Sequence, residues 1–113
     1  MKLYRLFWCF LVVTLTSCTT TVIEEAVVNE TVTYEGQVRS IVTNNCTTSC
    51  HNPSSLDGGL NLTTFSGMRD ATENGNVLSR INNATNPMPV GGQMPPILIA
   101  TIEQWAAQGF LEN

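Results

Sequence analysis

Cys46-Thr47-Thr48-Ser49-Cys50-His51 brings two thiols and an imidazole into one short stretch of this 113-residue chain. His51 is the only histidine in the sequence, and it directly follows the second of these two cysteines. Two neighbouring cysteines followed at once by a histidine are typical of the attachment site of a c-type haem, in which the thiols bind the porphyrin and the histidine binds the iron. The usual pattern separates the cysteines by two residues. Here three residues separate them, so we expect the loop between Cys46 and Cys50 to bulge.

The first 17 residues have the properties of a bacterial signal peptide. They begin with the basic residues Lys2 and Arg5, and residues 6–15 form an apolar run that is too short to cross a bilayer as a helix. The run ends in Leu15-Thr16-Ser17-Cys18, which resembles the lipobox of bacterial lipoproteins. We therefore predict that residues 1–17 are removed and that Cys18 carries lipid. An ordinary signal peptide and an uncleaved membrane anchor are the alternatives.

Lipid on Cys18 would hold the mature protein on the extracytoplasmic side of a bacterial membrane. Thr19 is not the aspartate that retains lipoproteins at the inner membrane, so the outer membrane is favoured, with the domain facing either the periplasm or the cell surface. Signal removal would leave three arginines, no lysine and all nine acidic residues, which gives a net charge of −6. This balance argues against nucleic acid as a partner and favours redox partner proteins with a basic docking surface.

The rest of the chain predicts a tether followed by a single helical domain. Residues 18–32 are rich in Thr, Val and Glu without helical periodicity, so we predict a flexible tether there, with a buried edge strand as the alternative. The domain would cover residues 33–113, and domains of about eighty residues are often stabilised by a metal, disulfides or a cofactor. Apolar spacing and turn signals predict helices, and no convincing strand, so the expected fold class is all-α. The expected helices are 34–44, 76–83, 97–108 and a short one at 65–71.

Four sequence elements together resemble a small mono-haem cytochrome c, and most closely a bacterial cytochrome c domain first described in planctomycetes. They are the Cys-x-x-x-Cys-His motif, Gly58-Gly59-Leu60-Asn61-Leu62, Met88-Pro89 and Trp105-Ala106-Ala107-Gln108-Gly109. The match covers residues 35–110. The resemblance implies a class I cytochrome c-like fold, in which three to four helices surround one haem c attached through Cys46 and Cys50.

The second axial ligand of such a haem would be a methionine or an open position. His51 would be the proximal ligand, and neither another histidine nor a lysine exists in the predicted mature chain. Met68 lies in a predicted helix and is expected in the core, whereas Met88 and Met94 both lie in a proline-rich loop. The resemblance favours Met88, because its Met-Pro context and its distance from Trp105 fit the family. Met94 remains the alternative distal ligand.

A haem with His/Met ligation predicts electron transfer, because an iron with both axial positions filled has no free site for a substrate. Asp57 is the only carboxylate near the motif, and it is expected to be a solvated turn residue. An electron carrier is therefore predicted rather than an enzyme. One alternative is a haem-based binder or sensor of small ligands. Another is a non-haem structural lipoprotein domain with a Cys46–Cys50 disulfide, while a zinc site would lack a fourth ligand.

Overall fold

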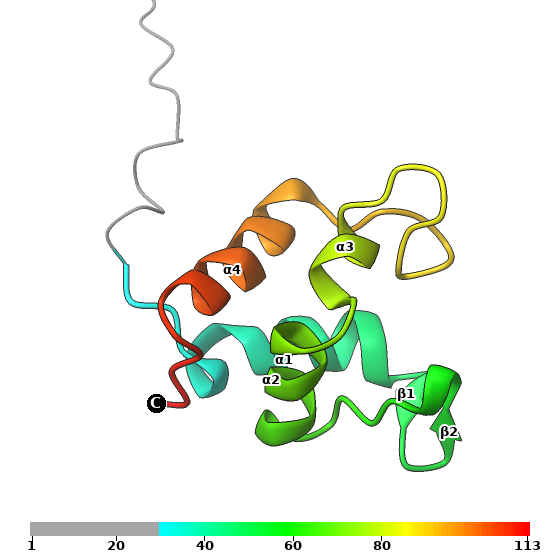
Figure 1. Ribbon diagram of the computed structural model, residues 1–113, viewed down its shortest axis with the longest axis horizontal. Helices are drawn as coiled ribbons and strands as arrows, with labels where there is room; N and C mark the ends of the chain where they lie inside the picture. The colour runs from blue at the N-terminus through cyan, green and yellow to red at the C-terminus, as the bar shows by residue number, and fades with distance from the viewer. Residues whose placement is uncertain (1–29) are drawn as a thin grey trace, which may run out of the picture.

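Helices predominate in the computed structural model, which describes residues 30–113 (Figure 1). The described part of the chain agrees with the predicted all-α class. None of its helices is long and apolar enough to cross a membrane. The predicted signal peptide at 1–17, the predicted lipidation site Cys18 and most of the predicted tether lie outside the described residues.

The chain from 34 to 47 is one continuous helical segment, in which an α-helical turn is flanked by two wider π-helical turns. These turns are Tyr34–Val38 (π), α1 (Arg39–Val42) and Thr43–Thr47 (π). The segment begins after Thr33, whose hydroxyl accepts a hydrogen bond of 3.0 Å from the Gly36 amide. Its buried face carries Val38, Ile41 and Val42, as the i, i+3, i+4 spacing predicts. The segment runs beyond the predicted end at residue 44, so Cys46 belongs to the helix.

A small hairpin that the sequence pattern did not predict follows the cysteine motif. Strand β1 (His51–Asn52) pairs antiparallel with β2 (Ser55–Leu56), with His51 opposite Leu56. The Asn52 side chain stabilises the turn, because its oxygen accepts hydrogen bonds from the amides of Ser54 and Ser55. A 3₁₀ turn, Asp57–Gly59, comes next, with φ of 65° at Gly58 and 75° at Gly59. These positive φ values explain why two glycines stand there.

Three α-helices complete the fold and confirm the three remaining helix predictions. They are α2 (Phe65–Glu73), α3 (Val77–Ile81) and α4 (Pro96–Ala107). Helix α2 is capped by Thr64, whose hydroxyl accepts a hydrogen bond of 3.1 Å from the Gly67 amide. Helix α4 begins at Pro96 and ends before Gly109, which has a φ of 88°. Proline at the start and glycine just past the end is the usual asymmetry of helix termini.

The core lies where the first helical segment, α2 and α4 meet. Its largest fully buried side chains are Trp105, Tyr34, Met68, Ile102, Val38 and Val42. Tyr34 and Trp105 join the first and last helices, with ring centroids 5.9 Å apart. Phe65 and Phe110 pack edge-on against this pair. The prediction that Met68 is a core residue is confirmed.

Residues 30–32, which the sequence analysis placed in the tether, are packed against α4. Val32 is only 4% exposed, and its amide donates a hydrogen bond of 2.8 Å to the side chain of Gln108. The amide groups of Gln104 and Gln108 both donate to the carbonyl of Glu30. The packed domain therefore starts about three residues before the predicted boundary at 33. The described chain enters and ends on the same side, away from β1 and β2 (Figure 1).

This boundary predicts that Val32→Ala destabilises the domain by about 1.6 kcal/mol, because two buried carbon atoms at roughly 0.8 kcal/mol each are lost. Urea unfolding followed by circular dichroism measures the change. Thr31→Ala is the matched control, because Thr31 is exposed and such substitutions usually stay within about 0.5 kcal/mol. Equal stabilities of the two variants would show that residues 30–32 belong to the tether and not to the packed domain.

Candidate functional site

A cavity of about 380 Å³ lies between the end of the first helical segment, the hairpin and α3. In Figure 1 these elements lie away from the points where the described chain begins and ends. The walls of the cavity come from the end of the first helical segment, the hairpin with its following turn, α3, and the loop after α3. Apolar wall residues are Leu60, Leu62, Val77, Ile81, Pro89 and Val90. Its volume falls within the range of about 300–1,000 Å³ that is common for small-molecule and cofactor sites.

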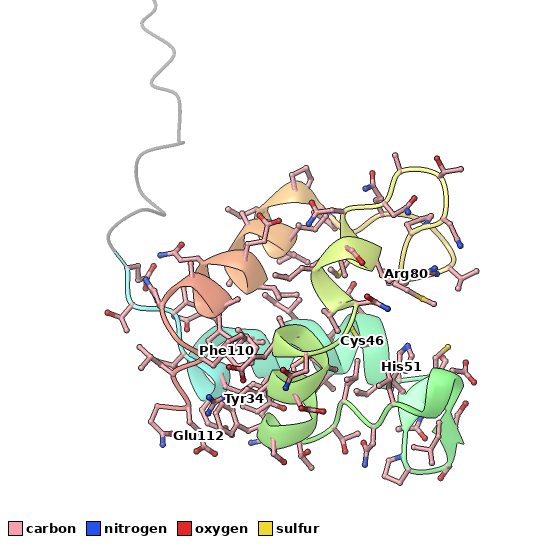
Figure 2. All side chains as sticks on the ribbon, in the orientation of Figure 1. Tyr34, Cys46, His51, Arg80, Phe110 and Glu112 are labelled. Carbon is pink, nitrogen blue, oxygen red and sulfur yellow. The ribbon has the colours of Figure 1, made fainter. Side chains whose placement is uncertain are left out.

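Both cysteines of the motif line this cavity, and so does His51. Cys46 is on the last helical turn, Cys50 is in the connection, and His51 opens β1. The intervening Thr48 and Ser49 are exposed. The loop between the cysteines thus bulges outward at Thr48 and Ser49, while Cys46 and Cys50 line the same cavity. Figure 2 shows Cys46 and His51 on the side of the molecule away from Tyr34 and Phe110.

The two thiols are free and have different electrostatic surroundings. Burial raises the pKa of the Cys46 thiol to about 11. The pKa of Cys50 is also raised, first by burial and then by a hydrogen bond to Asp57 and the charge of that carboxylate. Both thiols are therefore protonated at neutral pH. Asp57 itself is exposed, in agreement with its predicted position in a solvated turn.

The carboxylate near Cys50 predicts that Asp57→Asn speeds alkylation of this thiol at a fixed mildly alkaline pH. Removing the negative charge lowers the Cys50 pKa and increases the reactive thiolate, by up to about tenfold for each pKa unit. Cys46 keeps its slow rate because burial, not Asp57, raises its pKa. Iodoacetamide labelling of the protein without cofactor, read by peptide mass spectrometry, measures both rates. Asp70→Asn is the control, and an unchanged Cys50 rate in Asp57→Asn would contradict the assignment.

His51 is held by its backbone, whereas its ring has a nitrogen without a partner. The His51 carbonyl accepts a hydrogen bond of 3.0 Å from the Leu62 amide, which fixes β1 against the chain that follows the turn. Ring atom Nδ1 is buried and has no hydrogen-bond partner among the described residues. A histidine that binds a metal usually donates its other ring N–H to a carboxylate, a backbone carbonyl or water. Gly58 and Leu60 line the cavity beside His51.

The two candidate distal methionines occupy different places. Met88 is half-buried and lines the cavity, whereas Met94 is 4% exposed, belongs to the hydrophobic core and is not part of the cavity wall. Met88 is positioned by its own amide, which donates a hydrogen bond of 3.1 Å to the carbonyl of Arg80 in α3. The Asn83 side chain supports the same loop by accepting hydrogen bonds from the amides of Thr85 and Asn86. The structure thus brings Met88, and not Met94, together with Cys46, Cys50 and His51.

Arg80 is a cavity residue that the sequence analysis did not single out. Its Nε atom is buried without a hydrogen-bond partner among the described residues, and its Nη2 makes only a long contact of 3.4 Å with the Asn86 side chain. An unsatisfied buried donor costs roughly 1–3 kcal/mol, and more when it is charged. The available sequence signal was the placement of a charged residue next to Ile81 on the short apolar helix α3. That signal alone does not separate a cavity residue from a solvated one.

Trp105 and Tyr34 do not take part in the cavity wall. Trp105 is fully buried in the core, and its indole nitrogen donates a hydrogen bond of 2.8 Å to the Leu111 carbonyl. Trp105 is therefore a packing residue of the core. Within residues 30–113, no three His, Cys, Asp or Glu side chains are grouped so that they could hold a metal ion by themselves.

Comparison with protein-family models, curated proteins and solved structures found no match. The assignment of the site therefore depends on its residues and geometry.

Proposed function

We propose that the protein is an electron carrier with one c-type haem, attached through Cys46 and Cys50 and ligated by His51 and Met88. One observation carries this proposal. Residues that a haem c site requires come from the first helical segment, β1 and the loop after α3, and they line the same apolar cavity. The unpartnered buried Nδ1 of His51 also fits a site in which a bound group completes the surroundings of the ring.

Each residue would have a separate task. Cys46 and Cys50 would hold the porphyrin through thioether bonds, which prevents loss of the cofactor. His51 would bind the iron from the hairpin, and Met88 would bind it from the loop that is hydrogen-bonded to α3. The bound haem supplies reversible one-electron chemistry between ferrous and ferric iron. His51 and Met88 would together hold the iron and leave no site on it for a substrate, and a methionine ligand would raise the reduction potential relative to histidine.

The fold that fits this function is a class I cytochrome c-like arrangement of helices around the haem. The first helical segment and α4 are joined by Tyr34 and Trp105, and neither of these side chains lines the cavity. Cavity residues Leu60 and Val90 are 39% and 79% exposed, so an edge of the bound group would lie close to solvent. Proximity of the haem edge to the surface permits electron exchange with a second protein.

The proposed carrier is a lipoprotein that works outside the cytoplasm, anchored through Cys18 to a bacterial membrane, with the outer membrane favoured. Its partners would be redox proteins with a basic docking surface, because the mature chain would have a net charge of −6. The same charge makes nucleic acid an unfavourable partner.

The test is expression of the full chain in a bacterium that contains a cytochrome c maturation system. We expect a red protein that keeps its haem after denaturation and shows one reversible one-electron step in a potentiometric titration. The ferrous protein should bind CO only slowly, because Met88 would have to leave the iron first. Rapid stoichiometric CO binding would instead indicate a ligand sensor. A colourless protein with a Cys46–Cys50 disulfide would indicate a structural domain.

A further inference from the structure

We propose that Arg80 binds a propionate carboxylate of the haem, so that its guanidinium is the anion-binding group of the cavity. This inference rests on the proposed function and extends it, because it assigns a residue that neither the cysteine motif nor the axial ligands require. Figure 2 shows Arg80 on the same side of the molecule as Cys46 and His51. All three side chains line the cavity.

Charge pairing distinguishes Arg80 from the other arginines of the described region. Within residues 30–113, the other two arginines already have carboxylate partners on their own helices. Arg39 contacts Glu35 at 2.7 Å, and Arg69 contacts Glu73 at 3.2 Å. Arg80 forms no ion pair with any residue of this described region. A carboxylate from a bound group would supply the partner that Arg80 lacks, and arginine is well suited to bind carboxylates through two parallel hydrogen bonds.

The burial of the Arg80 side chain also indicates a ligand. The Arg80 Nε atom is shielded from solvent and has no acceptor, while the contact from Nη2 to Asn86 is long at 3.4 Å. Buried polar groups in folded proteins nearly always have a hydrogen-bond partner, so an orphan donor in a cavity wall indicates an acceptor on the ligand. The only two buried side-chain atoms without partners in the described region are His51 Nδ1 and Arg80 Nε, and both residues line this cavity.

The shape of the wall indicates which acceptor is needed. Apolar side chains such as Leu62, Val77 and Ile81 surround most of the space, and one guanidinium interrupts them. Such a wall fits a large apolar body with an anionic group, which is the chemistry of a porphyrin with propionates. The other charged wall residue, Asp57, is exposed and accepts hydrogen bonds near Cys50, so it does not serve the same group.

Arg80 would also connect this anion to the distal ligand. Its backbone carbonyl accepts the Met88 amide hydrogen bond at 3.1 Å, while its side chain lines the cavity. Binding of a propionate by Arg80 would therefore fix α3 against the haem and hold the origin of the Met88 loop in place. Arg80 acts on the iron only through these contacts and is a positioning residue for Met88.

The experiment compares matured wild-type protein with Arg80→Gln, Arg80→Lys and Arg39→Gln. Arg39→Gln removes the same charge from an exposed side chain that is paired with Glu35, so it controls for net charge. The measurements are the resonance Raman propionate-bending band and the midpoint potential. We expect Arg80→Gln to shift the band and to lower the potential, because loss of a nearby positive charge disfavours the reduced haem. Arg80→Lys should shift the band with a smaller change in potential, and Arg39→Gln should match wild type.

An Arg80→Gln holoprotein with the wild-type band and the wild-type potential would overturn this inference while leaving the proposed electron carrier intact. If Arg80→Gln accumulates without haem, Arg80→Lys decides, because it keeps the charge but lacks the planar fork. An unchanged band in that variant would overturn the inference. A wild-type protein that is itself colourless after maturation would remove the proposed function and this inference together.

Discussion

Replacement of both Cys46 and Cys50 by alanine is expected to abolish covalent haem attachment. In wild type, the haem should stay with the polypeptide through denaturation and extraction with acidified organic solvent. In the double variant, all of it should partition into the solvent, because the thioether bonds cannot form. The measurement is the haem absorbance of the protein and solvent fractions after expression with the maturation system.

The single variants make this expectation more specific. Cys46→Ala and Cys50→Ala each leave one thiol in the cavity wall, so each should yield less matured protein, with one thioether visible in the pyridine haemochrome spectrum. Thr48→Ala is the matched control, because Thr48 lies between the two cysteines but is exposed. Circular dichroism of the variants without haem checks the fold. Haem that resists extraction from the double variant would show that these cysteines are not the attachment site.

The helices were predictable because their information is local. Val38, Ile41 and Val42 show the helical spacing in the sequence and form the buried face of the first helical segment. Proline and glycine marked the ends of α4 in the same way. The hairpin at His51 was not predictable from alternation, since each strand has only two residues and is defined by backbone pairing and an Asn52-capped turn.

At Val32 and Arg80, the structure differs from what the sequence suggests because of contacts between segments that are far apart in the sequence. Val32 looks like a tether residue in sequence, and its burial depends on Gln108 at the far end of the chain. Arg80 looks like a surface charge on a short helix, but its Nε atom is buried, and its side chain lines a cavity whose other walls include the hairpin and the Met88 loop. Neither position has a local signal, because its surroundings in the fold come from other segments of the chain.

The candidate site was predictable where its residues lie close together in the sequence, and not where it depends on the path of a loop. Cys46, Cys50 and His51 are adjacent in sequence, so their chemistry could be inferred before any fold was known. Met88 and Met94 share one proline-rich loop, and sequence alone left both as candidates. Their separation depends on the path of the loop, which is hydrogen-bonded to the Arg80 carbonyl near Met88 and enters the core at Met94.

This separation predicts opposite phenotypes for Met88→Ala and Met94→Ala. Met88→Ala should keep nearly wild-type stability before haem attachment, since Met88 is only half-buried and lies in a loop. After maturation, it should lose the low-spin methionine-ligated spectrum and bind CO rapidly, because the distal position is open. Met94→Ala should keep the wild-type spectrum but lose about 2–5 kcal/mol of stability, because truncation of a buried methionine leaves a cavity in the core.

Visible and near-infrared spectra of the holoproteins give the ligation state, and urea unfolding of the proteins without haem gives the stability. Each variant serves as the control for the other, because both remove the same atoms from the same loop. A Met94→Ala protein that loses methionine ligation, beside a Met88→Ala protein that keeps it, would reassign the distal ligand to Met94. Because Met94 is packed in the core and is not part of the cavity wall, that result would require the loop to be rebuilt when haem binds.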